Sequence, residues 1–275
     1  MRDFPQELVD LVIDKLAEPT PKRFPRWEDM SKYSTVSRQW VGRTQKYHFR
    51  FLLFSNQDKL ERWCAESEAD PSGLSRHVRN LTLNHINTLQ DFDDHIRAFA
   101  HLRSLTLRSC RILRSLSDVE SLVRVGSTLV QLAILGTIKT TPYIMTSFLA
   151  GLPCLRYLRL FSLSVDDDLA DATMLPPSIP FFEGGAGTLD LSLMAPRGVS
   201  FDWIPPTARF RNLEITARCA RDRHKFVNQW LVSSGRCLQS LIIREDPLST
   251  YLDLFLFQSP SSNSATSFQI SISTT

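Results

Sequence analysis

Cysteine and histidine are the side chains of this sequence best suited to nucleophilic or metal chemistry, but their spacing does not favour either. The five cysteines lie far apart and include no C-x-x-C pair, so we expect neither a disulfide framework nor a zinc site. The six histidines include no HExxH or other paired-ligand spacing. There is no Gly-x-Ser-x-Gly elbow, and Gly126-Ser127-Thr128 lacks the lysine and spacing of a phosphate-binding loop. The sequence therefore predicts no enzyme, no metal and no cofactor.

Charge and hydropathy point to no nucleic-acid or membrane partner. The 32 basic and 29 acidic residues nearly balance, whereas nucleic-acid binding usually requires a concentrated basic stripe. Acidic residues such as Asp10 and Asp14 interrupt the apolar N-terminus, and no apolar run approaches membrane-spanning length. Together with the odd number of cysteines, this predicts a reducing location, cytoplasmic or nuclear.

One apolar pattern recurs along most of the chain: an apolar residue, two variable residues, an apolar residue, one variable residue and a last apolar residue. Its middle positions are Leu81, Leu105, Leu132, Leu158, Leu189, Leu213 and Leu241. Successive middle positions lie 24 to 31 residues apart, close to the period of about 20 to 29 residues of leucine-rich repeats. The last two apolar positions alternate as in a strand with one buried face, and helical spacing follows several of the strands. We therefore expect an α/β fold: a leucine-rich-repeat solenoid with parallel strands on its concave face and helices on its convex face.

The repeat domain is expected to span residues 49–275, with about seven to nine units. Phe49-Phe51-Leu53 predicts a first strand, and Ser55 with Asp58 predicts a capped helix after it. Phe268-Ile270-Ile272 predicts a last strand, following a serine-rich, low-complexity stretch at 259–267.

The longest step between units contains an insertion at 164–187. Its run of aspartates, its Pro176-Pro177 pair and its Gly184-Gly185 pair are typical of a long loop. Two interpretations stay open: a loop that binds a partner, and a solvated connection between units.

Residues 1–48 have an all-helical pattern instead. Phe4 to Leu16 predicts a helix, because Pro5 suits a first turn and Glu7 favours the N-terminal end of the helix dipole. Its apolar residues cover a wider arc than one buried face requires, so we expect a second contact surface. Apolar residues at three- and four-residue spacing between Met30 and Val41 predict a further helix.

Three segments of this region resemble the F-box motif. Phe4-Pro5-Gln6-Glu7-Leu8 matches a Leu-Pro-x-Glu-Leu opening, Ile13 and Leu16 follow, and Val36-Ser37-Arg38-Gln39-Trp40 matches a closing Val-Cys-Arg-x-Trp. Phe4 and Ser37 depart from the commoner Leu and Cys, and residues 18–29 lengthen the connection between the segments. Followed by leucine-rich repeats, the motif is similar to that of F-box and leucine-rich-repeat proteins, notably the divergent fungal sets.

This resemblance implies a substrate receptor of an SCF-type (cullin-RING) ubiquitin ligase. The helical module would bind the small adaptor protein of the ligase, and through it a cullin, while the repeats bind a target protein for ubiquitination. Adaptor binding is expected to rest on a few apolar and aromatic anchors. These are Phe4, Pro5, Leu8, Val12, Ile13, Leu16 and Trp40. Packing among the module's own helices is the alternative for Trp40 and Val36.

Target binding is expected at the strand positions that alternate with the buried leucines, because these line the concave face of such a scaffold. They are Asn80, Thr82, Asn84, Thr106, Arg108, Tyr157, Arg159, Phe161, Asp190, Asn212, Glu214 and Arg244. Arg108, Arg159 and Arg244 suit an acidic or phosphorylated segment. Because Asp190 and Glu214 share the face, an ordinary mixed-charge surface stays open as an alternative. The alternative function is a leucine-rich-repeat scaffold that acts outside ubiquitin ligation, with the N-terminal helices as its cap.

Overall fold

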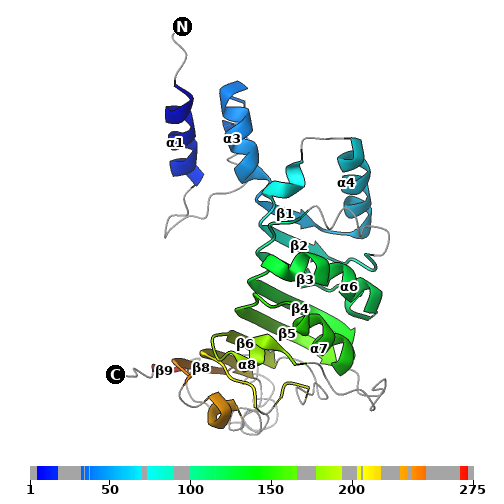
Figure 1. Cartoon of the computed structure of the whole chain (residues 1–275), viewed down its shortest axis with the longest axis vertical. Coiled ribbons are helices and arrows are strands. Elements are labelled where there is room, and N and C mark those ends of the chain that lie inside the picture. Colours follow the sequence, from blue (N-terminus) through cyan, green and yellow to red (C-terminus); the bar gives the residue numbers. More distant parts are fainter. Residues whose placement is uncertain are drawn as a thin grey trace, which may run out of the picture.

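Two neighbouring helices lead into one long sheet with helices along one side of it (Figure 1). This arrangement is seen in a computed structural model. It describes residues 5–17, 32–33, 35–36, 38–69, 73–89, 99–114, 116–165, 178–193, 203–205, 207–217, 230–234, 237–245 and 267–271. The elements change from helix to strand between His48 and Phe51.

Helices α1 (Gln6–Ala17) and α3 (Arg38–His48) lie side by side (Figure 1). Asp14 of α1 connects them, because Arg43 Nε donates to its Oδ1 at 2.7 Å and the Tyr47 hydroxyl donates to the same oxygen at 2.8 Å. The hydrogen bond from Arg43 is the largest cause that lowers the pKa of Asp14 to about 2. The carboxylate is therefore ionised at neutral pH and ties the two helices together.

Within the described part of the chain, nine strands form a single sheet in which the spatial order is the order along the chain. They are β1 (Phe51–Phe54), β2 (Asn80–Asn84), β3 (Ser104–Arg108), β4 (Gln131–Thr140), β5 (Tyr157–Val165), β6 (Thr188–Leu193), β7 (Asn212–Ala217), β8 (Ser240–Glu245) and β9 (Ser267–Ser271). The first eight strands run parallel, which confirms the predicted α/β class with parallel strands. The expected last strand is present, but it pairs antiparallel to β8 and so does not repeat the geometry of the other units.

The strand register aligns the repeated leucines on adjacent strands. Leu81 pairs with Leu105, which pairs with Leu132, which pairs with Leu158. The row continues through Leu189, Leu213 and Leu241. All of these side chains are buried in one core. Since burying a leucine contributes about 1.5 to 3 kcal/mol, each unit gains stability by stacking on its neighbour.

Helices on one side of the sheet complete that core. They are α4 (Gln57–Ala69), α6 (Leu116–Val125), α7 (Pro142–Ala150) and α8 (Pro180–Glu183), with short 3-10 turns η1 (Leu74–His77), η3 (Ile112–Arg114) and η4 (Gly126–Thr128). Figure 1 places α4, α6 and α7 along the same side. The cap of α4 differs from the prediction: Asn56 Oδ1, and not Ser55, accepts the Lys59 N–H at 3.1 Å. Thr141 caps α7 by accepting the Ile144 N–H at 3.2 Å.

One register position of β2, β3 and β4 is followed by a residue with positive φ. His85 and Ser109 directly follow β2 and β3, whereas Gly136 lies at the equivalent position inside β4, at the register shift between Leu135 and Ile138. At Gly136 the φ is +87°, and an added Cβ would lie 2.7 Å from Ser109 Oγ, so glycine is required there. Cys110 is buried in the turn after β3, where its thiol donates to the Leu83 carbonyl at 3.1 Å. The backbone therefore takes the same left-handed conformation at this position in three consecutive units, although β4 continues beyond it to Thr140.

The insertion at 164–187 is more ordered at its ends than the loop prediction stated. Its first two residues belong to β5, and α8 lies near its other end. Phe181 and Phe182 of α8 are buried, and the Phe182 ring packs edge-to-face against Phe210 with centroids 5.8 Å apart. The loop prediction was wrong here, because these aromatic rings anchor the connection in the core. Residues 166–177 lie outside the described residues.

Candidate binding surfaces

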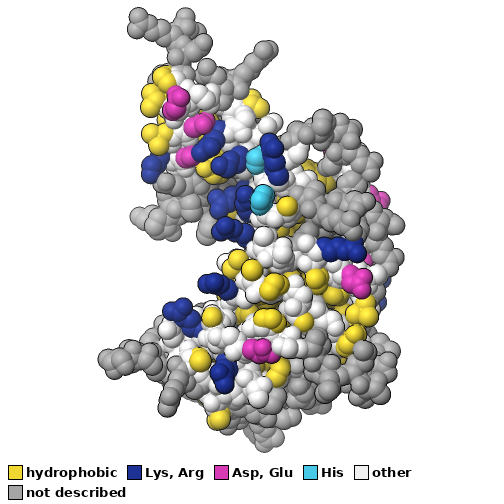
Figure 2. All heavy atoms as spheres, viewed as in Figure 1, with side chains coloured by type: hydrophobic (Ala, Val, Ile, Leu, Met, Phe, Trp, Pro, Cys, Tyr) yellow, Lys and Arg dark blue, Asp and Glu magenta, His cyan; other side chains and the backbone are white. Residues whose placement is uncertain are grey.

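The outer side of α1 is an exposed apolar stripe. Leu8, Leu11, Val12 and Leu16 are 46%, 56%, 44% and 40% exposed. They follow three- and four-residue spacing and so lie on one face of the helix. Hydrophobic side chains gather over this side of the helix pair in Figure 2. Three of the predicted adaptor-binding anchors, Leu8, Val12 and Leu16, therefore share a surface, and Leu11 extends it. Pro5 is exposed at the start of the same helix.

The opposite side of α1 packs against the rest of the helical module. Val9 and Ile13 are buried against Tyr33, Trp40 and Tyr47. The prediction that Ile13 contacts a partner was wrong, because its side chain is fully buried and serves the core of the module. Trp40 is half-buried beside Tyr33, with ring centroids 6.4 Å apart, which agrees with the packing alternative. Val36 is 61% exposed and does not pack in this way.

Two predicted features of the module, Phe4 and the connection at 18–29, lie outside the residues that the structure describes.

The register places the predicted target-binding residues in three rows across the face of the sheet opposite α4, α6 and α7. Asn80, Tyr157 and Asn212 lie in the row at the strand starts. The middle row contains Thr82, Thr106, Arg159, Asp190 and Glu214. The third row contains Asn84, Arg108, Phe161 and Arg244. All twelve are thus on neighbouring strands, although the side chain of Arg244 lies outside the described part of the structure.

The centre of this face is a polar cluster on β5 and β6. Tyr157 donates its hydroxyl hydrogen to Asp190 Oδ2 at 3.1 Å, and Arg159 Nε lies 3.1 Å from the same oxygen. Burial, followed by the charge of Asp190, raises the pKa of Tyr157 to about 12, so the phenol stays protonated at neutral pH. Asp190 is only 7% exposed, which corrects the expectation that it meets solvent. Asp190 orients Tyr157 and Arg159, of which Tyr157 is half-buried and Arg159 is exposed.

A further side-chain hydrogen bond on this face joins β7 to β6. Asn212 Nδ2 donates to Thr188 Oγ1 on the neighbouring strand at 3.0 Å. The predicted first strand is present as β1, but the faces of its residues differ from the prediction. Phe51 and Leu53, on which it was predicted, are 55% and 61% exposed, whereas Leu52 and Phe54 pair in register with Leu81 and Leu83. Leu53 pairs with Thr82 and so extends the middle row.

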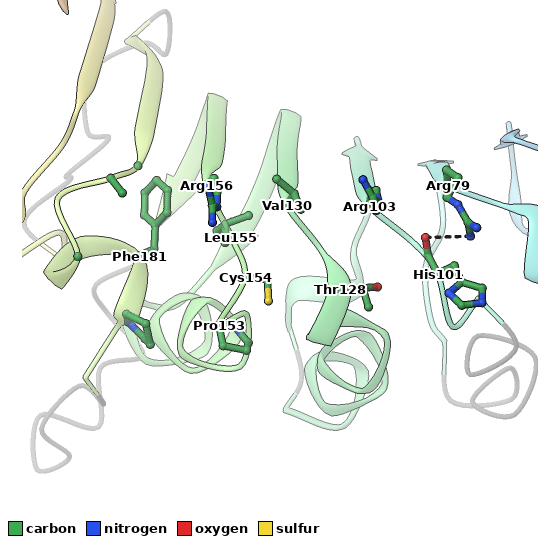
Figure 3. Close-up of a pocket in the computed structure, with 14 residues that line it drawn as sticks. Arg79, His101, Arg103, Thr128, Val130, Pro153, Cys154, Leu155, Arg156 and Phe181 are labelled. Atoms are coloured by element: carbon green, nitrogen blue, oxygen red, sulfur yellow. Dashed lines mark hydrogen bonds between the residues drawn. The ribbon is translucent and has the colours of Figure 1, made fainter. Parts of the chain in front are cut away.

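Sequence reasoning also missed a row of arginines at the edge where the parallel strands begin. Figure 2 shows Lys and Arg side chains running down one side of the molecule, and Figure 3 shows Arg79, Arg103 and Arg156 standing in strand order along it. The signal was the residue after the first apolar position, which is arginine in four of the seven repeats: Val78-Arg79, Leu102-Arg103, Leu155-Arg156 and Phe210-Arg211.

Neither metal coordination nor membrane insertion is indicated by the described residues. Among them, no three His, Cys, Asp or Glu side chains are grouped to hold a metal ion. No helix in the described part of the chain is long and apolar enough to span a membrane.

Comparison with known proteins gives no relative. No protein-family model, no curated protein and no solved structure matches this chain.

Proposed function

We propose that this chain is the target-recruiting subunit of an SCF-type ubiquitin ligase, with an F-box-like helical module and a leucine-rich-repeat solenoid. The observation that carries the proposal is the apolar outer stripe of α1, formed by Leu8, Leu11, Val12 and Leu16, in a helix whose other side already packs in the module. A helix with two apolar sides needs a second partner to cover the exposed one.

The sheet supports the solenoid part of the proposal. Each unit contributes one strand, the strands stack in chain order, and aligned leucines fill the space beneath them. Contacts only between consecutive units are the mark of a repeat architecture. His85, Ser109 and Gly136 repeat the same left-handed conformation at equivalent register positions of β2, β3 and β4.

In this proposal the chain works by bringing two proteins together. The α1 stripe holds the ligase adaptor, as an amphipathic helix does when it lies in an apolar groove. The open face of the sheet, with Tyr157 and Arg159 at its centre, holds the target. The gain in rate comes from the raised effective concentration of target lysines near the ubiquitin-charged enzyme, so no residue of this chain performs the chemistry.

A second candidate function is supported by the junction between the module and the sheet. Phe49 follows α3 and packs its ring against Trp63 of α4, with centroids 6.0 Å apart. Such a contact suits a cap on a leucine-rich-repeat scaffold that works outside ubiquitin ligation. This reading explains α3, but it gives no role to the exposed stripe of α1.

Co-purification with the ligase adaptor tests the proposal. The wild-type chain, expressed with an affinity tag, is expected to retain the adaptor and its cullin. Leu8→Asp with Val12→Asp is expected to abolish capture, because two charges would have to be buried in the contact.

The matched control is Leu116→Asp, which places a charge at an apolar residue of similar exposure, 42%, on α6. It is expected to retain the adaptor. Circular dichroism checks that all variants stay folded. A wild-type chain that retains no adaptor, or equal loss in the control, contradicts the proposal.

A further inference from the structure

The arginine row at the edge of the sheet is built by the strand register. Each of these arginines stands directly before a strand. They are Arg50, Arg79, Arg103, Arg156 and Arg211, hereafter the arginine ladder. Backbone hydrogen bonds hold them in place: the Arg79 N–H donates to the Arg50 carbonyl at 3.0 Å, and the Arg103 N–H donates to the Arg79 carbonyl at 2.8 Å. Val130 and Gly187 occupy the equivalent positions before β4 and β6.

Most of the ladder's charge is exposed. Arg50, Arg103, Arg156 and Arg211 are exposed, and Arg79 is half-buried. Within the described part of the chain, no carboxylate pairs with Arg50, Arg103 or Arg156. Arg79 and Arg211 bond to neutral groups, the His101 carbonyl at 3.3 Å and the Gln239 side-chain oxygen at 2.6 Å.

The surroundings of the ladder add positive charge and little negative charge. The described segments that lead into the strands contain no Asp or Glu: 45–50, 73–79, 99–103, 126–130, 151–156, 184–187, 207–211 and 237–239. Burial, followed by the nearby cations Arg76, Lys46 and Arg79, lowers the pKa of His77. Lys46 belongs to α3, so the positive field continues from the sheet edge onto the helical module.

A groove of about 740 Å³ follows the central part of the ladder. Its walls include Arg79, His101, Arg103, Arg156 and Phe181. Figure 3 shows Arg79, Arg103, Val130 and Arg156 in a line along it, followed by Phe181. The groove is therefore elongated, and the guanidinium groups of Arg79, Arg103 and Arg156 are spaced along one side of it.

The type of cation and the lack of stacking surfaces indicate a peptide and not a nucleic acid. A planar guanidinium binds carboxylate or phosphate with two parallel hydrogen bonds, which a lysine ammonium does not do. Proteins that bind single-stranded nucleic acid pair such charge with exposed aromatic rings on which the bases stack. The Phe181 ring in this groove is only 4% exposed, and among the described lining residues the His101 imidazole is the one exposed aromatic ring.

From these contacts we infer that the arginine ladder binds an extended acidic or phosphorylated peptide segment of the target, which runs across the strands along the sheet edge. The inference rests on the proposed function, since the target of a ubiquitin ligase is a polypeptide. Adjacent strands lie about 4.8 Å apart, so the six steps from β1 to β7 span about 29 Å. An extended chain rises about 3.3 Å per residue, and about nine residues therefore cover the ladder.

Fluorescence anisotropy with four labelled probes tests this inference on the full chain. The probes are a nine-residue peptide of alternating Glu and Ser, the same peptide with phosphoserines, a Gln and Ser peptide, and a nine-nucleotide oligouridylate. The phosphopeptide, alone or with the Glu peptide, is expected to bind more tightly than the neutral peptide. The difference should shrink as salt rises from 50 to 500 mM, because exposed ion pairs are screened.

Arg103→Gln with Arg156→Gln is expected to weaken acidic-peptide binding about tenfold, since each exposed ion pair contributes a factor of about two to five. The control, Arg111→Gln with Arg114→Gln, removes the same charge from two exposed arginines away from the ladder and is expected to bind as wild type does. Equal weakening in both variants, no preference over the neutral peptide, or tighter binding of oligouridylate overturns the inference. Binding of the phosphopeptide alone assigns recognition to phosphate, and binding of both acidic peptides assigns it to negative charge in general.

The ladder variant is also assayed for adaptor capture, which separates this inference from the proposed function. It is expected to retain the adaptor. If wild type captures the adaptor but binds no acidic peptide, only the inference about the arginine ladder is contradicted. If it binds the peptide but captures no adaptor, only the ubiquitin-ligase proposal is contradicted.

Discussion

Replacing Asp14 with asparagine is expected to loosen α1 from α3. The substitution keeps the size of the side chain but removes the negative charge that accepts hydrogen bonds from Arg43 and Tyr47. Because Val9 and Ile13 are the only two core residues that α1 contributes to the described module, the polar contact is a large part of what holds the helix in place.

The size of the effect follows from the pKa of Asp14. Lowering this pKa from 3.8 to about 2 corresponds to about 2.4 kcal/mol if the pair were fully shielded from water. The Asp14 and Arg43 side chains are 35% and 28% exposed, so solvent screening reduces the contribution to about 1 kcal/mol. That free energy changes the equilibrium for local opening about fivefold.

Hydrogen exchange of the α1 backbone amides at pH 7 measures this opening. Asp14→Asn is expected to raise their exchange rates about fivefold. Asp10→Asn is the control, because Asp10 on the same helix accepts only an exposed hydrogen bond from Gln6 at 2.9 Å among the contacts seen here. Equal exchange in the two variants would refute the reasoning.

The pH dependence of the free energy of unfolding tests the role of Asp14 a second time. The folded-state pKa lies below the unfolded value, so the carboxylate stabilises the module fully above pH 3.8, and this contribution is lost as the pH falls from 3.8 toward 2. The difference in stability between wild type and Asp14→Asn is therefore expected to be constant from pH 7 to about 5, to fall as the pH passes through 3.8 and 2, and to disappear near about pH 1. Urea unfolding at each pH measures it.

Three further predictions concern the sheet and its turns. Leu132→Ala is expected to lower the free energy of unfolding by about 2 to 5 kcal/mol in urea denaturation, because its side chain is fully buried; a loss below 1 kcal/mol would show that the leucine row does not support the fold. Gly136→Ala is expected to destabilise by about 1 to 3 kcal/mol, whereas Gly42→Ala, in a helix with open space around it, should stabilise by about 0.5 to 1 kcal/mol, and both are read from thermal unfolding. In native protein a maleimide is expected to label exposed Cys154 while Cys110, whose thiol pKa burial raises, stays unmodified in peptide mass spectrometry; comparable labelling of both would contradict the buried turn.

The repeat was predictable because one local rule is applied many times. In a strand with one buried face, apolar and polar residues must alternate. Leu81, Leu105 and Leu132 each belong to such an alternating segment, and the segments recur at a nearly constant step along the sequence. Register then follows, since a slip by one residue would expose every leucine in a strand. The first strand was predicted from the alternation of Phe51 and Leu53, but these two side chains are exposed, and Leu52 and Phe54 pair with the buried leucines of β2 instead.

What escaped prediction depends on contacts between distant segments. The sequence shows that α1 has two apolar sides, but the position of Trp40 and Tyr47 decides that Ile13 faces inward and Val12 outward. Asp190 belongs to an outward-facing strand position, yet Tyr157 and Arg159, about thirty residues earlier, cover it.

The arginine ladder could not be predicted from the overall amino-acid composition. A net charge of +3 over the whole chain conceals a positive edge, because the described segments that lead into the strands contain no Asp or Glu. Only the pairing of the strands in register brings Arg50, Arg79 and Arg103, each directly before its strand, next to one another.

The most direct test of the proposed receptor role is the mass of the species formed when the purified chain and the purified ligase adaptor are mixed at micromolar concentration, measured by light scattering after gel filtration. We predict one peak with the mass of a one-to-one complex, which separates into two components when Leu8 and Val12 are both replaced by aspartate. Two separate peaks with the wild-type chain would contradict the account.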